Sequence, residues 1–213
     1  MASSAGEAPT IAAVLLDMDG TLVDSHAAVE RAWRHWAEIW GADADAVLAI
    51  SPGRPADQTI REALPQLSKA QVAQAAAEQL ALQYDDLDDV VALPGLEALL
   101  AAVAERGLPW AVVTSADPPL AAARLRAVAV EAPVLVTCED VTHGKPHPEP
   151  YLVAAQQLGV PAAACLVVED AAAGVAAGRA AGMRVAGVWG AVGDLPTRTL
   201  LDVAELLRAT REQ

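Results

Sequence analysis

The chain has 213 residues, with 14 Lys and Arg against 28 Asp and Glu, which gives a formal net charge of −14. Such an acidic surface repels phosphate backbones, so it argues against a nucleic-acid partner and leaves any anionic substrate dependent on a local cation or metal ion. A hydrophobic content of 54% supports a real core, although there is no Phe, and the length allows one large domain or a core with a smaller insert.

The first nine residues are small and polar, lack a basic residue and precede only a short apolar stretch. They predict a disordered tail rather than a signal peptide or an anchor. The two cysteines, Cys138 and Cys165, show neither CxxC spacing nor a disulfide framework, which is typical of core-filling thiols in a reducing compartment. We therefore expect a cytoplasmic protein with no membrane partner.

An apolar run over residues 11–16 ends abruptly in Asp17 and Asp19, followed by Gly20. The run has the length of a strand buried on both faces, and ligands gather beyond the carboxyl ends of such strands. Because residues i and i+2 of an extended chain point to the same side, both carboxylates are expected to face one pocket. The plainer interpretation is that the strand runs into an ordinary Asp-Gly turn.

Residues 26–90 contain helical patterns at residues 27–40, 56–64 and 68–84 but no strand-like run. We interpret this region as a helical cap inserted into the fold. Trp33, Trp36 and Trp40 recur in it at helical spacing, which more often indicates a packed core than a binding platform. The remaining segments, residues 10–25 and 91–213, are assigned to one core domain.

From residue 95 onward, helices and strands alternate. Helices are predicted near residues 95–106, 118–129, 149–158 and 171–181, and strands near 109–114, 134–137, 164–168 and 184–188. This alternation implies right-handed βαβ units and a mostly parallel sheet covered on both faces. The predicted fold is therefore an α/β, doubly wound, Rossmann-like core with an inserted helical cap domain.

Two further strand ends carry polar residues. Thr114 and Ser115 follow the strand near residues 109–113 and precede the helix start at Asp117, where free backbone N–H groups bind phosphate. These hydroxyls could equally serve only as caps. Glu169 and Asp170 follow the strand near residues 165–168, and together with Asp17 they supply the oxygen ligands that magnesium takes.

Lys145 lies in a loop rich in proline, between His143 and His147, and could neutralise a bound phosphate or be an ordinary solvated lysine. The histidine spacing raises the alternative of a metal site there. The other candidate ligands are hard carboxylates, which favour magnesium. The helix after Asp170 contains Gly174 and Gly178, which we expect to permit close packing.

Taken in order, these motifs resemble those of the haloacid dehalogenase-like hydrolase superfamily, in the subclass with a helical cap after the first strand. They are DMDGTLVDS at residues 17–25, Thr114-Ser115, Lys145 within GKPHPEP at residues 144–150, and EDAAAG at residues 169–174. The resemblance covers nearly the whole chain and implies a fold, a reaction and a metal ion together.

The resemblance implies that Asp17 attacks phosphorus to form an aspartyl-phosphate, while Asp19 acts as general acid and base. Thr114 and Ser115 would hold phosphate oxygens, and Lys145 would bridge nucleophile and phosphate. The implied magnesium ligands are Asp17, the main-chain carbonyl of Asp19, Asp170, and Glu169 either directly or through water. The implied enzyme is a phosphoric monoester hydrolase that depends on Mg²⁺.

Asp19 favours phosphoryl transfer over dehalogenation, because dehalogenases of the family lack this second aspartate. A β-phosphoglucomutase-like mutase shares all four motifs, but its additional His and Arg correspond here to Val29 and Ala56. Water is therefore the expected acceptor. A phosphoglycolate phosphatase and, more remotely, a binding domain without turnover stay open as alternatives.

The cap turn at residues 51–57 contains one positive charge, Arg54, which either binds a second end of the substrate or pairs with Asp57 or solvent. This turn and the Lys145 loop are most similar to those of sugar and glycerol phosphatases in the subclass. The expected substrate is a small sugar or polyol phosphate. We expect a monomer or at most a weak homo-oligomer.

Overall fold

The computed structural model describes residues 10–52, 54–84 and 87–210. The predicted disordered tail, residues 1–9, lies outside the described residues. Within the described part of the chain, no helix is both long and apolar enough to span a membrane.

The central strand of the fold is β1 (Ala13–Leu16), which is fully buried and leads directly to the two aspartates. It pairs in parallel with β4 (Trp110–Val113) on one side and β6 (Cys165–Glu169) on the other. The short β5 (Leu135–Val136) and β7 (Arg184–Gly187) complete a sheet with the order β5-β4-β1-β6-β7. Strands buried on both faces explain the continuous apolar runs in the sequence.

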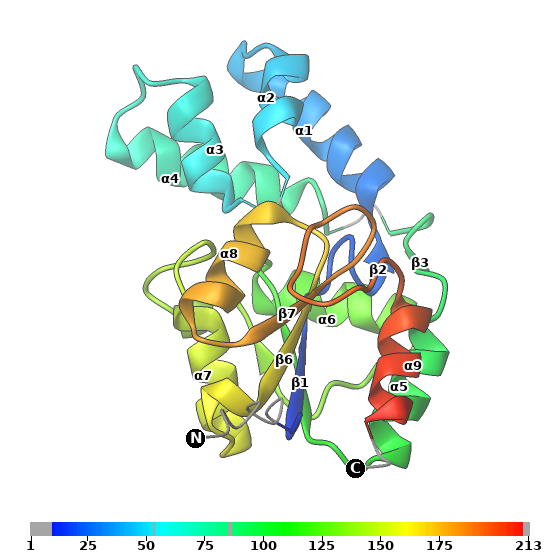
Figure 1. The fold of residues 1–213 in the computed structure, drawn as a ribbon. Coiled ribbons are helices and arrows are strands. Elements are labelled where there is room, and N and C mark those ends of the chain that lie inside the picture. The colour runs from blue at the N-terminus through cyan, green and yellow to red at the C-terminus, as the bar shows by residue number, and fades with distance from the viewer. Residues whose placement is uncertain (1–9, 53, 85–86, 211–213) are drawn as a thin grey trace.

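Helices cover both faces of this sheet (Figure 1). On one face lie α5, α6 and α9, and on the other α7 and α8, each packing against its own hydrophobic cluster. Their bounds are α5 (Leu96–Glu105), α6 (Pro118–Ala127), α7 (Glu149–Leu158), α8 (Ala172–Ala180) and α9 (Leu200–Ala209). Two short 3₁₀ helices, Cys138–Asp140 and Ala162–Ala164, lie between them. The predicted doubly wound α/β core is therefore confirmed.

Among the described residues, four helices form the cap above one end of the sheet (Figure 1). They are α1 (His26–Trp40), α2 (Ala44–Ile50), α3 (Ala56–Ala63) and α4 (Lys69–Ala81). A two-stranded ribbon of β2 (Val23–Asp24) and β3 (Val91–Ala92) joins the cap to the core. The inserted helical cap is thus confirmed, while the proposed bounds of 26 and 90 stay predictions.

The tryptophan stripe of α1 packs inside the cap, as its spacing predicts. Trp36 is fully buried, stands edge-on to Trp33 and stacks on Trp40. The indole of Trp36 donates to the carbonyl of Ala75 at 2.9 Å, which ties α1 to α4. The cap therefore has a hydrophobic core of its own.

Several elements were not predicted from the sequence. Helix α2 has only one buried residue, Val47, so it lacks an apolar period, and the β2–β3 pair is too short to give a local signal. Helix α9 did carry a signal, because Thr199 forms a capping box with Asp202 ahead of a buried, periodic apolar face. The prediction that Cys138 fills the core is wrong, since its side chain is exposed.

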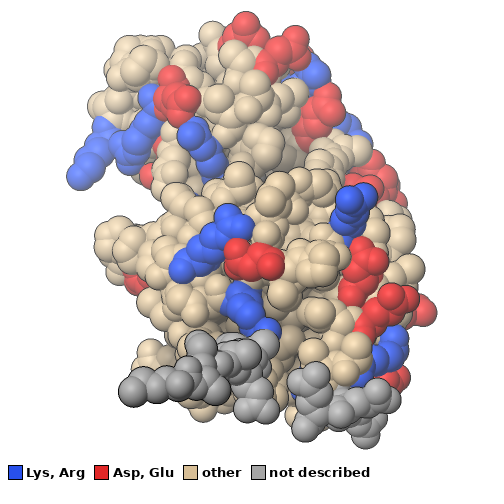
Figure 2. Space-filling model, viewed as in Figure 1, with Lys and Arg blue, Asp and Glu red and all other residues tan. Residues whose placement is uncertain are grey.

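On the face shown in Figure 2, acidic and basic side chains are interspersed, and a notch at the left separates the cap from the core. A surface of this kind offers no continuous basic patch on that face, in keeping with the net charge of −14.

We predict that Trp36→Ala lowers the free energy of unfolding by about 3–5 kcal/mol, because it removes a fully buried indole and its hydrogen bond. Ile39→Ala is the matched control, since Ile39 lies on the same helix and is 55% exposed, and it should cost no more than about 0.5 kcal/mol. Urea unfolding followed by circular dichroism measures both. Equal losses would show that the stripe is not a core.

Candidate active site

The polar residues that follow separate strands meet around one cavity of about 510 Å³ between core and cap. Residues after β1, β4 and β6 and the loop before α7 all contribute. The predicted site residues lining it are Asp17, Asp19, Arg54, Thr114, Ser115, Lys145, Glu169 and Asp170. They converge because parallel strands end at the same edge of the sheet.

The turn after β1 requires a residue without a side chain at Gly20. Its φ is +79°, and a Cβ built there would lie 2.3 Å from Oδ2 of Asp170. The next residue, Thr21, donates its hydroxyl to Oδ1 of Asp170 at 2.8 Å. The β1 turn therefore both admits the Asp170 carboxylate and holds it beside Asp17.

Lys145 is buried, at 3% exposure, within the acidic cluster. Its Nζ donates to Oδ1 of Asp17, to Oε1 of Glu169 at 2.7 Å and to the carbonyl of Val113 at 3.0 Å. Burial alone lowers the pKa of Lys145, but Asp17 and Glu169 raise that pKa well above its ordinary value. The lysine thus stays charged, and it is not a solvated loop residue.

Glu169 holds this lysine in place. Its Oε1 also accepts from the hydroxyl of Tyr151 at 2.7 Å, and its Oε2 accepts from the backbone N–H of Ala171 at 3.2 Å. A Cβ at Gly174 would lie 1.6 Å from Oε1, so the glycine of α8 is needed for this approach. Both carboxylate oxygens of Glu169 are engaged by protein groups, whereas direct metal ligation by Glu169 stays a prediction.

Asp17, Glu169 and Asp170 each present an oxygen within 4.8 Å of the others, which suits a metal ion. Burial raises the pKa of Asp17 well above its usual range, and the Glu169 carboxylate raises it further. Burial likewise raises the pKa of Asp170. Carboxylates crowded in this way carry an electrostatic cost that a bound divalent cation would offset.

Asp19 is held by two side chains, only one of which belongs to the predicted motif. Its Oδ1 accepts a hydrogen bond from the hydroxyl of Ser25 at 2.7 Å and forms an ion pair with Nη1 of Arg124 at 2.7 Å. Arg124 comes from α6 and was not predicted from the sequence. Its place on the same helix face as the apolar residues Leu120 and Ala121 was a signal that could have indicated a buried, paired cation. Both contacts engage Oδ1 of Asp19, and its proton-transfer role stays a prediction.

Thr114 and Ser115 lie at the pocket floor, where β4 leads into α6. The hydroxyl oxygen of Thr114 accepts from the N–H of Ala116 at 3.1 Å, and Asp117 caps α6 by accepting from the N–H of Leu120 at 3.0 Å. Thr114 therefore shapes the turn ahead of α6, and the side chain that caps the helix is Asp117 rather than Thr114 or Ser115. Ser115 lines the pocket and is half-buried. The phosphate-binding roles of Thr114 and Ser115 stay predictions.

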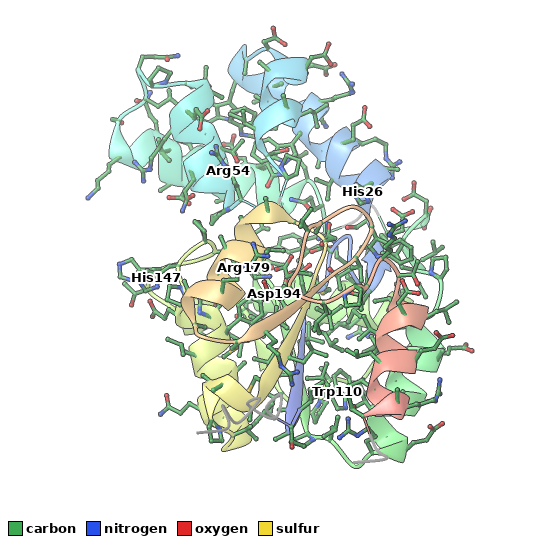
Figure 3. The ribbon with its side chains drawn as sticks, in the orientation of Figure 1. His26, Arg54, Trp110, His147, Arg179 and Asp194 are labelled. Atoms are coloured by element: carbon green, nitrogen blue, oxygen red, sulfur yellow. The ribbon has the colours of Figure 1, made fainter. Side chains whose placement is uncertain are left out.

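Arg54 lies in the cap above α8 (Figure 3) and lines the pocket. It does not pair with Asp57: its Nη1 donates to Glu62 at 2.6 Å, while Asp57 pairs with Arg61 at 3.5 Å. The helical geometry explains the difference, since residues 57 and 61 of α3 are one turn apart. A substrate contact by Arg54 stays a prediction.

The histidines flanking Lys145 are exposed and do not belong to the acidic cluster. His143 and His147 form a second group of metal-ligand type with Glu149, and Figure 3 shows His147 at the outer edge of the core. Glu149 mainly accepts from the N–H groups of Thr142 and His143, at 2.8 Å and 3.0 Å. This carboxylate therefore fixes the loop that carries Lys145.

The family model of haloacid dehalogenase-like hydrolases matches residues 11–182. The chain belongs to the haloacid dehalogenase-like hydrolases. Hexitol phosphatase A of Escherichia coli (strain K12) is 43% identical over 190 residues, covering 89% of this chain and 88% of that protein. Glycerol-1-phosphate phosphohydrolase 2 of Saccharomyces cerevisiae (strain ATCC 204508 / S288c) is 31% identical, covering 83% of this chain and 74% of that protein.

A solved structure of β-phosphoglucomutase from Clostridium difficile aligns with a TM-score of 0.75 at 24% identity, over 84% of this chain and 85% of that one. At this identity, the likeness supports the fold of the haloacid dehalogenase-like hydrolases and no particular reaction. The resemblance predicted from the four motifs is confirmed by the family match.

We predict that Asp170→Asn flattens the pH dependence of stability in metal-free buffer. The pKa of Asp170 is raised in the folded state. Its protonated carboxyl therefore stabilises the fold at pH values below the ordinary pKa of the group. This stabilisation is lost as the pH rises through the folded-state pKa. Asparagine keeps the acceptor for Thr21 and carries no charge. Melting temperatures in EDTA from pH 4 to pH 7 check this, and a steeper fall in the variant would contradict it.

Proposed function

We propose that this protein is a magnesium-dependent phosphatase that hydrolyses small sugar or polyol phosphates through an aspartyl-phosphate. One observation carries the proposal: a buried aspartate at the end of the central strand is held by a buried lysine, with a second aspartate two residues on. Membership of the haloacid dehalogenase-like hydrolases and the phosphatase relatives support the same reaction.

Asp17 is the proposed nucleophile. Since Lys145 engages its Oδ1, Oδ2 is the oxygen that attacks phosphorus. As the P–O bond to the leaving alcohol breaks, Oδ2 of Asp19 gives its proton to the departing oxygen. Asp19 then takes a proton from water, and the hydroxide attacks phosphorus to release inorganic phosphate and regenerate Asp17. Ser25 and Arg124 keep the Asp19 carboxylate oriented throughout.

The proposed magnesium ligands are Asp17, Asp170 and the main-chain carbonyl of Asp19, with Glu169 acting directly or through water. When bound, the ion neutralises charge on the nucleophile and on the transferring phosphoryl group. Thr114, Ser115 and Lys145 are proposed to hold the phosphate oxygens. The raised pKa values of Asp17 and Asp170 support a cation at this place rather than at the exposed histidine group.

A β-phosphoglucomutase-like mutase is the second candidate, because the four motifs do not distinguish it from a phosphatase. Val29 and Ala56, at the positions where such mutases carry His and Arg, both line the pocket. Neither side chain can exchange a proton or hold a second phosphate. Water is therefore the better-supported acceptor, and a non-catalytic binding domain has no use for this cluster of buried charges.

We predict that the protein releases inorganic phosphate from sorbitol 6-phosphate or glycerol 1-phosphate only with magnesium. Asp17→Asn should lower kcat on the order of a thousandfold or more, since the nucleophile is lost. Phosphate release by malachite green, with sugar products followed by NMR, measures both activities. Isomerised sugar phosphate without phosphate release would identify a mutase instead.

We also predict that magnesium raises the melting temperature, with a stabilisation of about 2.7 kcal/mol at a hundredfold excess over Kd. Asp170→Asn should remove most of this shift. His143→Ala is the control, because His143 belongs to the other metal-ligand group and should leave the shift intact. If His143→Ala loses the shift and Asp170→Asn keeps it, the ion binds at the exposed histidine group and not beside Asp17, and the prediction is wrong.

A further inference from the structure

The exposed histidine group brings three potential metal ligands together outside the acidic cluster. His143, His147 and Glu149 each present one ligand atom, and these atoms lie within 4.8 Å of one another. Nδ1 of His143 is 2.9 Å from Oε2 of Glu149, and Nδ1 of His147 is 3.7 Å from the same oxygen. In a tetrahedral site with metal–ligand bonds of about 2.0–2.2 Å, ligand atoms stand roughly 3.3 Å apart. The two measured distances lie on either side of that spacing.

The histidine group is open to an ion from solvent. The exposed fraction of the side chain is 62% for His143, 49% for His147 and 27% for Glu149. Figure 3 shows His147 at the outer edge of the core. Both histidines line a cleft of about 610 Å³ whose other wall is the start of cap helix α3. An ion can therefore reach the three ligand atoms without any movement of the backbone.

Hydrogen bonds hold two of the ligands in the protonation state that a metal ion requires. The backbone N–H of Glu149 donates to Nδ1 of His147 at 3.3 Å, so this ring nitrogen carries a lone pair and not a proton. The backbone N–H of Thr142, together with the ring of His143, lowers the pKa of Glu149, so its carboxylate is ionised at neutral pH. Metal ligands must be deprotonated in just this way.

The loop that carries the histidine group is fixed before any ion binds. Lys145, between the two histidines, is anchored in the acidic cluster by its hydrogen bonds. The N–H of His147 donates to the carbonyl of Gly144 at 3.0 Å, and Pro146 and Pro148 flank His147. Because the backbone is already ordered, binding an ion orders little more than side chains, which keeps the entropic cost of binding low.

The donor set favours a different ion from the one proposed for the acidic cluster. Imidazole nitrogen suits zinc and the neighbouring transition metals, whereas magnesium takes oxygen ligands. Two histidines and one glutamate also make up a known three-ligand zinc set, in which water completes the coordination. With neutral imidazoles the group carries one negative charge, and the whole chain carries −14. Both charges favour the approach of a divalent cation.

We propose that His143, His147 and Glu149 bind a zinc-type transition-metal ion, at a site separate from the magnesium site proposed beside Asp17. A bound ion would connect the two sides of the loop that carries Lys145. The inference goes beyond the proposed phosphatase function and does not depend on it, because none of the three ligands belongs to the acidic cluster.

The experiment titrates full-length protein, prepared without a histidine tag, with Zn²⁺ in a calorimeter. Excess Mg²⁺ is present so that oxygen sites are occupied. We expect His143→Ala and His147→Ala each to weaken Zn²⁺ binding about tenfold or more, since even the loss of a residue that supports a ligand costs that much. His35→Ala is the matched control and should bind Zn²⁺ as the unaltered protein does. His35 is exposed on α1 and belongs to no such group among the described residues.

Co²⁺ then identifies the ligands, because Co²⁺ bound by ring nitrogens at low coordination number absorbs visible light more strongly than hydrated Co²⁺. This absorption should persist in His35→Ala and Asp170→Asn and disappear in both variants of the histidine group. Melting temperatures in EDTA separate the loss of a ligand from the loss of the fold.

Three results would overturn the site. One is equal Zn²⁺ affinity in the unaltered protein and in both variants of the histidine group. Another is a loss of binding confined to Asp170→Asn, which would place the ion in the acidic cluster. The third is a loss confined to Cys138→Ser, which would place it on the exposed thiol in the same cleft.

Discussion

The buried ammonium group of Lys145 is the contact on which the site depends. A buried charge is costly unless it is paired and hydrogen-bonded, and Lys145 meets this requirement with two carboxylates and one carbonyl. These partners come from or directly follow β1, β4 and β6, so one side chain ties three neighbouring strands together at their carboxyl ends. Its charge also offsets part of the repulsion between Asp17 and Glu169. Asp17, Lys145 and Glu169 are therefore one interdependent unit.

A second network links this unit to the cap. Arg124 of the core contacts Asp19 and, through Gln83, the cap residue Gln79. The hydroxyl of Tyr84 also donates to Asp117 at the start of α6, next to the turn that carries Thr114 and Ser115. The cap thus takes part in a polar network that reaches Asp19 rather than only covering the pocket.

The net charge of the molecule and the charges that line the pocket affect an anionic substrate in different ways. The net charge of −14 opposes the approach of anions at long range. Within the pocket, carboxylates already neutralise every Lys and Arg lining it among the described residues. Under the proposed function, a phosphate group would rely on a bound cation, so the expected metal dependence follows from this charge distribution.

The sequence alone determined the α/β core, the cap and the convergence of four strand-end motifs. Hydrophobic periodicity is a local property of the sequence, and the carboxyl ends of parallel strands meet at one edge of a sheet whatever the side chains are. It also identified the tryptophan stripe of the cap. Sequence reasoning did not find Arg124, Gln79 or Gln83, or the pairing of Arg54 with Glu62. Gln83 and Arg124 are 41 residues apart, and Arg124 is further still from Asp19. No periodic pattern specifies such contacts, so only the packing of the cap against the core decided which of these polar side chains pair with one another.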